Sequence, residues 1–309
     1  AIDFKAKGQW LMGFGVGEGS PVDTYRTNNG VKTKGSNEDD FQAAQRLRLQ
    51  LDAVASESLS GTVYFEIGTA QWGKAENGAA LGADGSNQIK LKRAYIDWAV
   101  PDTDAKVRMG IQGVALPNVA GGSAVMDTDV AGITVNYKFN ENVGLTALWA
   151  RPLNDNYTDG GNNGKQANYL DNMDLFSLMA PLTFDGVNVT PWVMYGMVGK
   201  NALKNQWDNV SAYDSVGTSD GNLAYSLRPY PGIGATNGNM GKTGNDYGSA
   251  FWVGLPIGIT LWDPLNIELD INYGYMQSMG RFDAVKNGVT KRASSERQGW
   301  LAKALVEYK

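Results

Sequence analysis

The chain has 309 residues, of which 42% are hydrophobic and 19% are charged, with a formal net charge of -5 and neither cysteine nor histidine. These absences exclude disulfides, thiolate catalysis, the Ser-His-Asp triad and metal sites built on Cys or His ligands. The negative charge argues against a nucleic-acid partner, because neutralising phosphates requires clustered Lys and Arg. The 39 Gly, 9 Trp and 14 Tyr beside only 10 Pro predict an all-β chain of many strands and turns.

Residues 2–16 alternate between apolar and polar side chains over their whole length. Strands of soluble proteins usually have about 5 to 6 residues, so a run of this length is typical of a tilted membrane strand. The apolar parity holds Ile2, Phe4, Ala6, Trp10, Met12, Phe14 and Val16.

Further alternating runs follow along the chain. Residues 41–55 and 59–67 are separated by only three residues, which predicts a β-hairpin. Residues 265–275 alternate most clearly, with Leu, Ile and Tyr on one parity and Asn, Glu and Asp on the other. Less regular strands are predicted at 87–100, 105–113, 131–139, 143–151, 171–184, 187–199 and 247–259. Together with these, the alternating runs, including the first and last of the chain, give about twelve strands.

The predicted connections alternate in length. Those at 56–58, 101–104, 140–142, 185–186 and 262–264 are short, and the others are long and rich in Gly, Asn and Asp. This layout is typical of an outer-membrane barrel. We therefore interpret residues 1–309 as a single antiparallel β-barrel domain, exported and with its signal peptide removed, because the chain opens at Ala1 without Met.

A soluble β protein, such as a jelly roll or a lectin-like sandwich, is the alternative fold. It explains the Trp residues near strand runs less well, since membrane barrels use such residues as interfacial girdles. The polar stretch 200–246 is long for one loop and is expected to contain another hairpin.

The segment QIKLKRAYIDWAVPDTDAKVRMGIQ, residues 88–112, resembles the Gram-negative general porins. The resemblance rests on Arg93 and Tyr95 in a strand, a short turn, and Gly110 followed by Gln112. It implies a transmembrane up-and-down barrel of fourteen to sixteen strands in the cell outer membrane, assembled as a homotrimer and in contact with membrane lipid and lipopolysaccharide. It also implies that the third long loop, residues 113–132, folds into the barrel and narrows it.

Strand parity suggests which charged side chains line the channel. If the even-numbered residues of the first run face lipid, the basic residues of the opposite parity face the interior, together with Glu66. Opposite them, the resemblance places the acidic residues of the inserted loop, and the two groups would set a transverse field. The predicted pore-lining and constriction residues are Lys5, Lys7, Arg46, Arg48, Glu66, Arg93, Arg108, Asp127 and Asp129.

The function expected from this arrangement is passive diffusion of small hydrophilic solutes and ions, with a weak anion preference. A structural alternative is that Asp52, Glu66 and Asp97 simply neutralise the arginines. No cofactor is expected, although the oxygen-rich loop 154–160 is compatible with calcium.

Three other functions stay open. One is an uptake channel specific for an oxyanion or a sugar, and another is a structural or adhesive barrel. The enzyme alternative is a hydrolase that uses the paired carboxylates Glu268 and Asp270, which lie on one strand face.

Overall fold

The computed structural model describes residues 2–18, 25–28, 31–34, 39–72, 89–119, 121–154, 172–198, 248–262, 264–277, 281–286, 289–294 and 296–308. In these ranges the chain forms 18 β-strands. No helix in the described ranges is long and apolar enough to cross a membrane.

The strand bounds are as follows. They are Asp3–Glu18 (β1), Tyr25–Asn28 (β2), Val31–Lys34 (β3), Asp39–Val54 (β4), Leu59–Gln71 (β5), Ile89–Ala99 (β6), Ala105–Ala115 (β7), Asp127–Lys138 (β8), Gly144–Asn154 (β9), Asn172–Met179 (β10), Leu182–Phe184 (β11), Val187–Val189 (β12), Trp192–Val198 (β13), Gly248–Trp262 (β14), Leu265–Met276 (β15), Arg281–Lys286 (β16), Val289–Ser294 (β17) and Arg297–Tyr308 (β18).

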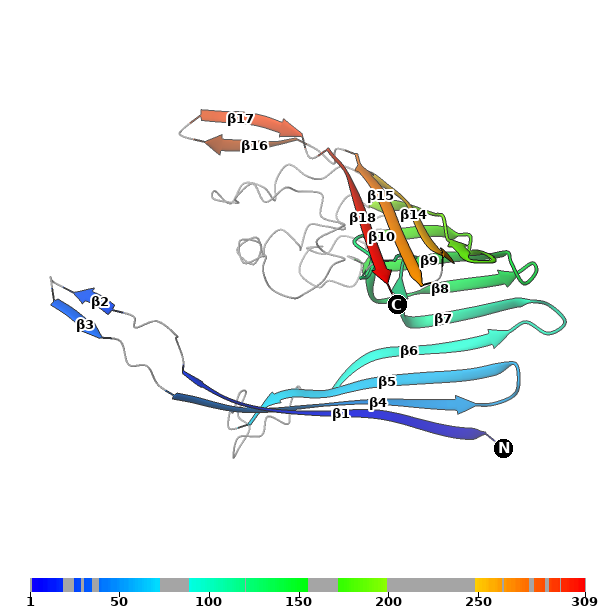
Figure 1. Ribbon diagram of the computed structural model, residues 1–309, viewed down its shortest axis with the longest axis horizontal. Helices are drawn as coiled ribbons and strands as arrows, with labels where there is room; N and C mark the ends of the chain where they lie inside the picture. The colour runs from blue at the N-terminus through cyan, green and yellow to red at the C-terminus, as the bar shows by residue number, and fades with distance from the viewer. Residues whose placement is uncertain are drawn as a thin grey trace, which may run out of the picture. The chain divides into compact units, whose positions relative to one another are not determined.

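Fourteen of these strands belong to one sheet, which starts β1-β4-β5-β6-β7-β8-β9-β10-β13-β14 and continues from β14 through β15 to β18. Apart from the short strands β11 and β12, which pair with each other and beside β14, neighbours in this order follow one another along the chain, as expected for an up-and-down topology (Figure 1). The described ladders are antiparallel. The predicted all-β, antiparallel, up-and-down fold is confirmed.

The chain divides into two compact units, Ala1–Ala94 and Tyr95–Lys309. The first unit contains β1, β4 and β5, and the second contains the strands from β7 onward, while β6 runs through the division. The prediction of one domain over residues 1–309 stays a prediction.

Two prolines explain why the sheet has fourteen strands where the sequence predicted about twelve. The predicted strands 171–184 and 187–199 are each divided in two, at Pro181 and at Pro191. Proline has no N–H to donate to a ladder. Hydrogen bonds nevertheless continue across both interruptions. The Ala180 N–H donates to the Pro191 carbonyl (2.9 Å) within the hairpin, and the Gly144 N–H of β9 donates to the Pro181 carbonyl (3.0 Å).

The short connections lie where the sequence predicted them. The turn after Phe184 depends on Gly186, whose φ is +69° and whose missing Cβ would lie 2.5 Å from the Leu261 side chain. The turn between β6 and β7 is closed by a hydrogen bond from the Val100 N–H to the Ala105 carbonyl (2.9 Å). The hairpin predicted within 200–246 lies outside the described residues.

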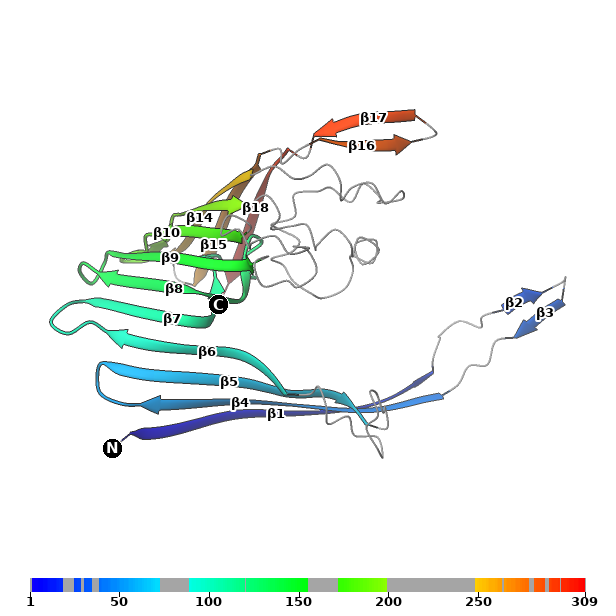
Figure 2. The same cartoon turned by 180° about the vertical axis from the view of Figure 1, so that it is seen from behind.

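Strands β7, β8, β9 and β10 of the second unit lie side by side (Figure 2). The register of the strands in this unit keeps apolar side chains on one face. One row across the sheet consists of Ile133, Trp149, Phe176, Tyr195, Phe251 and Tyr275. The next row consists of Val135, Ala147, Leu178, Val193, Val253, Tyr273 and Trp300. These side chains include many of the exposed large hydrophobic residues.

The opposite face of the second unit carries a buried apolar cluster. The cluster joins the end of β7 and the connection between β7 and β8 to β8, β9, β10, β13, β14 and the end of β15. Its members are Val114, Leu116, Val125, Met126, Val130, Leu148, Ala150, Met173, Leu175, Met179, Trp192, Met194, Val198, Ala250, Trp252 and Met276.

Gly132 is expected to be essential for the β8–β9 contact. A Cβ at this position would lie 2.3 Å from the Trp149 carbonyl oxygen, a backbone atom that cannot move away alone. Gly132→Ala should destabilise the folded chain by about 1–3 kcal/mol through overpacking. Urea unfolding in detergent measures the change.

Gly299→Ala is the matched control, since a Cβ there meets nothing within 4 Å. Equal stability of the two variants would contradict the proposed tight approach.

Candidate functional site

In the first unit, polar side chains line one parity of β1, β4 and β5. The register places Lys5 opposite Asp52 and Lys7 opposite Gln50. Asp52 is held by hydrogen bonds from the Gln50 Nε2 (2.9 and 3.0 Å) and from the Thr62 hydroxyl (2.7 Å). The basic Lys5 and Lys7 and the acidic Asp52 therefore lie on the same polar face.

The other predicted basic residues of this unit lie in the same region. The Arg48 Nε donates to Glu66 Oε2 (2.8 Å), and the Lys92 Nζ lies 3.8 Å from the same oxygen. The Arg93 guanidinium lies over the Tyr64 ring, 5.5 Å from its centre. Arg46 is opposite Leu11, and its Nε is buried with no hydrogen-bond partner in the described chain.

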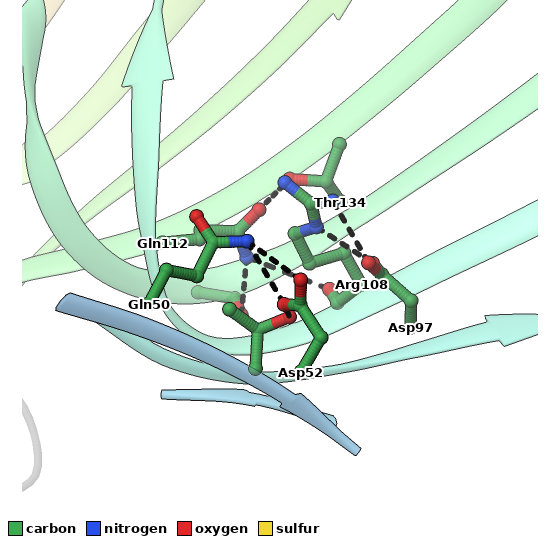
Figure 3. Close-up of polar contacts among 8 residues, drawn as sticks. Gln50, Asp52, Asp97, Arg108, Gln112 and Thr134 are labelled. Atoms are coloured by element: carbon green, nitrogen blue, oxygen red, sulfur yellow. Dashed lines mark hydrogen bonds and ion pairs between the residues drawn. The ribbon is translucent and has the colours of Figure 1, made fainter. Parts of the chain in front are cut away.

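In the second unit, Arg108 is held in place on the strand face opposite the apolar rows. Its Nε and one terminal nitrogen donate to the two Asp97 oxygens (2.6 and 2.9 Å), and its guanidinium lies 4.1 Å from the Tyr95 ring centre. Figure 3 shows this two-bond contact. Such a pair has fixed geometry, and its charges largely cancel.

Gln112 continues this ordered polar surface along β7. It is only 2% exposed. Its amide nitrogen donates to the Gly132 carbonyl (2.9 Å), and its oxygen accepts from the Thr134 hydroxyl (2.7 Å; Figure 3). Both ends of the amide are satisfied, so Gln112 is a structural residue of this face.

The acidic residues predicted for the inserted loop lie elsewhere. The connection between β7 and β8 is shorter than the predicted 113–132 and spans residues 116–126. Asp127 and Asp129 belong to β8, opposite Ala115 and Gly113. They are part of the strand because ladder pairing extends further than their loop-like composition suggested. Within β8 they share the strand parity of Ala131 and Ile133. Placing them on the loop was wrong, whereas a role in a constriction stays a prediction.

The connection 116–126 packs against the second unit through apolar contacts. Leu116 and Met126 are fully buried in the apolar cluster, and a hydrogen bond from the Leu116 N–H to the Met126 carbonyl (3.0 Å) closes its base. Sequence reasoning did not identify the wall that receives it. The available signal was that residues 192–198, and residues 175–179 apart from Ser177, are apolar on both parities, which is typical of strands covered on both faces.

Trp192 anchors the start of the connection. Its indole Nε1 donates to the Pro117 carbonyl (3.0 Å), and the side chain itself is 2% exposed. The ring has room because its neighbour across the ladder is Gly254, where a Cβ would lie 2.2 Å from the indole. A glycine opposite a tryptophan thus lets the indole lie close against the sheet.

Lys303 anchors the tip of the connection. Its Nζ donates to the Gly122 carbonyl (2.6 Å) and lies 3.1 Å from Asp270 Oδ2, an ion-pair contact without hydrogen-bond geometry. Asn272 donates to the other Asp270 oxygen (2.9 Å). Asp270 is fully buried, so this charge depends on Lys303 for compensation.

The same burial weighs against the paired-carboxylate hydrolase. Glu268 and Asp270 do lie on one strand face, yet Asp270 is sealed from solvent and engaged by Lys303 and Asn272. The described residues contain no group of three or more acidic residues that could hold a metal ion. The calcium-compatible loop lies outside the described residues beyond Asn154.

Neither a protein-family model nor a curated protein sequence matches the chain. Among solved structures, the outer membrane channel DcaP of Acinetobacter baumannii is similar at 11% identity and a TM-score of 0.46, over 100% of this chain and 74% of that one. OccK8 (OprE) of Pseudomonas aeruginosa gives 11% identity and a TM-score of 0.45, over 99% and 65%. A mutant of the Rh. blastica porin gives 10% identity and a TM-score of 0.33, over 99% and 100%. These values are too low to establish a common fold, so the chain's own geometry supports the function proposed below.

Trp192→Phe is expected to loosen the connection while retaining most of the ring packing. Loss of one buried hydrogen bond of about 1 kcal/mol should speed amide exchange in 116–126 about fivefold. Hydrogen–deuterium exchange with mass spectrometry measures this. Trp98→Phe, a change at an exposed ring on β6, is the control, and unchanged exchange in 116–126 would contradict the anchoring role.

Proposed function

We propose that the chain forms a channel across the bacterial outer membrane, of the porin type, through which small hydrophilic solutes and ions diffuse. The observation that carries the proposal is the continuous apolar face, which runs in register across the strands of the second unit. A soluble protein rarely exposes so large an apolar patch. Lipid is the environment that such a face fits.

The height of the apolar face matches a membrane. On β14 it runs from Phe251 to Leu261, which at about 3.3 Å per residue and a tilt of about 40° corresponds to roughly 25 Å along the membrane normal. This is the height of the lipid-facing band of outer-membrane barrels.

Polar and aromatic residues flank the band, as expected at membrane interfaces. At the long-connection end, Asp174 accepts from the Trp149 Nε1 (2.9 Å) and from Arg151 (2.8 and 3.1 Å). At the short-turn end, Trp262 and Tyr308 are exposed. Membrane lipid and lipopolysaccharide are the partners that this surface would meet.

The opposite face would line the aqueous interior. Arg48 and Arg108 are neutralised by Glu66 and Asp97, which favours the structural reading for these two residues. In the described chain, Lys5, Lys7 and Arg46 form no ion pair. A weak anion preference would therefore come from these three groups.

Purified, detergent-refolded protein added to a planar lipid bilayer should give discrete conductance steps, and the family resemblance predicts a homotrimer whose steps come in threes. In a salt gradient, the reversal potential should show a weak anion preference. Insertion without conductance would instead favour a plugged or structural barrel, and failure to insert would favour the soluble alternative.

The combined variant K5Q/K7Q/R46Q should shift the reversal potential toward cation preference, because it removes three positive charges from one polar face. Lys138→Gln, at the exposed end of β8, removes a single charge and should shift the reversal potential less than the triple variant does. An unchanged reversal potential in the triple variant would contradict the assignment of these residues.

A further inference from the structure

Strand β6 changes the parity of its apolar side chains partway along its length. Its large exposed hydrophobic residues are Ile89 and Leu91 at odd positions, and then Ile96 and Trp98 at even positions. Successive side chains of a regular strand point to opposite faces, so a regular strand would put these two pairs on different faces. One extra residue between Leu91 and Ile96, a β-bulge, would keep all four on the same face.

Contacts within the first unit locate the extra residue at Lys92 and Arg93. The Lys92 Nζ lies 3.8 Å from Glu66 Oε2, and the Arg93 guanidinium lies over the Tyr64 ring, 5.5 Å from its centre. Tyr64 and Glu66 are two positions apart on β5 and therefore share one face. Lys92 and Arg93 are consecutive, yet both side chains reach this face. A regular strand cannot do this, whereas a bulge, which sets two residues opposite one of the partner strand, can.

The face that receives Lys92 is the polar face of the first unit. Glu66 lies opposite Arg48 in the ladder and accepts a hydrogen bond from its Nε (2.8 Å). Arg46 also interacts electrostatically with Glu66. The Lys92 side chain keeps 29% of its surface exposed, so it is in contact with the surroundings of this face. Alternation counted back from Trp98 would place this lysine among apolar side chains, but it lies beside two arginines.

We propose that a β-bulge at Lys92 and Arg93 turns Lys92 into the aqueous interior, where it helps to set the ion selectivity of the proposed channel. The role in selectivity rests on that channel. Bulges commonly re-aim a side chain, and this one takes an ammonium group away from lipid, where a charge is costly. Strand parity predicted Arg93 but not Lys92 for the interior, because parity assumes a regular strand.

A cation at this position acts on passing ions through its charge. It lowers the energy of an anion beside it and raises that of a cation, and the effect is stronger where protein partly replaces water. The effect follows from the net charge of the wall, so it holds whichever neighbouring groups Lys92 contacts. Lys92 therefore adds to the anion preference attributed to Lys5, Lys7 and Arg46.

Single cysteines test the bulge without background, because the chain contains none. The refolded variants of the full chain are placed in lipid vesicles, and a charged, membrane-impermeant thiosulfonate is supplied on both sides. Lys92→Cys and Arg93→Cys should both react, at comparable rates. Leu91→Cys, the matched control on the apolar parity, should react at least about tenfold more slowly, because a thiol in apolar surroundings forms little of the reactive thiolate. Reaction at only one of positions 92 and 93, or at neither, would overturn the bulge.

Charge variants test the role in selectivity. Lys92→Gln should shift the reversal potential in a salt gradient toward cation preference. Lys92→Glu should shift it roughly twice as far, because it replaces the positive charge by a negative one. Lys92→Arg keeps the charge and should retain the wild-type value, which separates the effect of charge from that of altered packing. An unchanged reversal potential in both Lys92→Gln and Lys92→Glu would overturn the assignment.

The two proposals fail in different ways. Reaction of both cysteines without conductance would reject the channel and leave the bulge, whereas conductance with reaction at only one of the two positions would reject the bulge and leave the channel.

Discussion

Cross-strand register is the constraint on which the rest of this structure depends. Side chains alternate between the two faces of a strand, so a slip by one residue would move every apolar side chain to the opposite face. The register is held across long ladders, such as the sixteen paired positions from Asp3↔Val54 to Glu18↔Asp39. In the first unit, the single alignment of β1 with β4 both places apolar side chains such as Phe4 and Trp10 on one face and sets Lys5 opposite Asp52 on the other.

The second unit uses its two strand faces differently from the first. In the first unit the parity opposite the apolar residues is polar and charged, with Arg48 bonded to Glu66. In the second unit the corresponding parity of β10 and β13 is apolar and covered, with Leu175 and Met194 fully buried. An apolar wall requires a cover that excludes water, and the connection 116–126 provides part of it.

The sequence predicted the strands well because alternation is a local signal. All twelve predicted segments contain strand, and Arg48 and Glu66 share a face as their parity required. The ion pairs themselves could not be predicted. The contact between Arg108 and Asp97 joins two strands, so it depends on the register between those strands and on the side-chain rotamers, not on spacing along the chain. The loop assignment of Asp127 failed because composition cannot say how far a ladder extends. The split at Pro181 could have been anticipated, since a proline interrupts a ladder wherever its N–H would be needed.

The anchoring of the connection links its packing to electrostatics. Apolar burial of Leu116 and Met126 would hold the connection's two ends, yet its tip near Gly122 offers little side-chain surface for packing. Lys303 holds that tip through a carbonyl oxygen and at the same time compensates the buried Asp270. Removing one partner of such a pair typically costs about 3–5 kcal/mol, because an uncompensated charge is left in a dry environment. The buried Asp270 carboxylate therefore holds Lys303 in place, and Lys303 in turn holds the tip. The position of the connection thus depends on the pairing of β15 with β18.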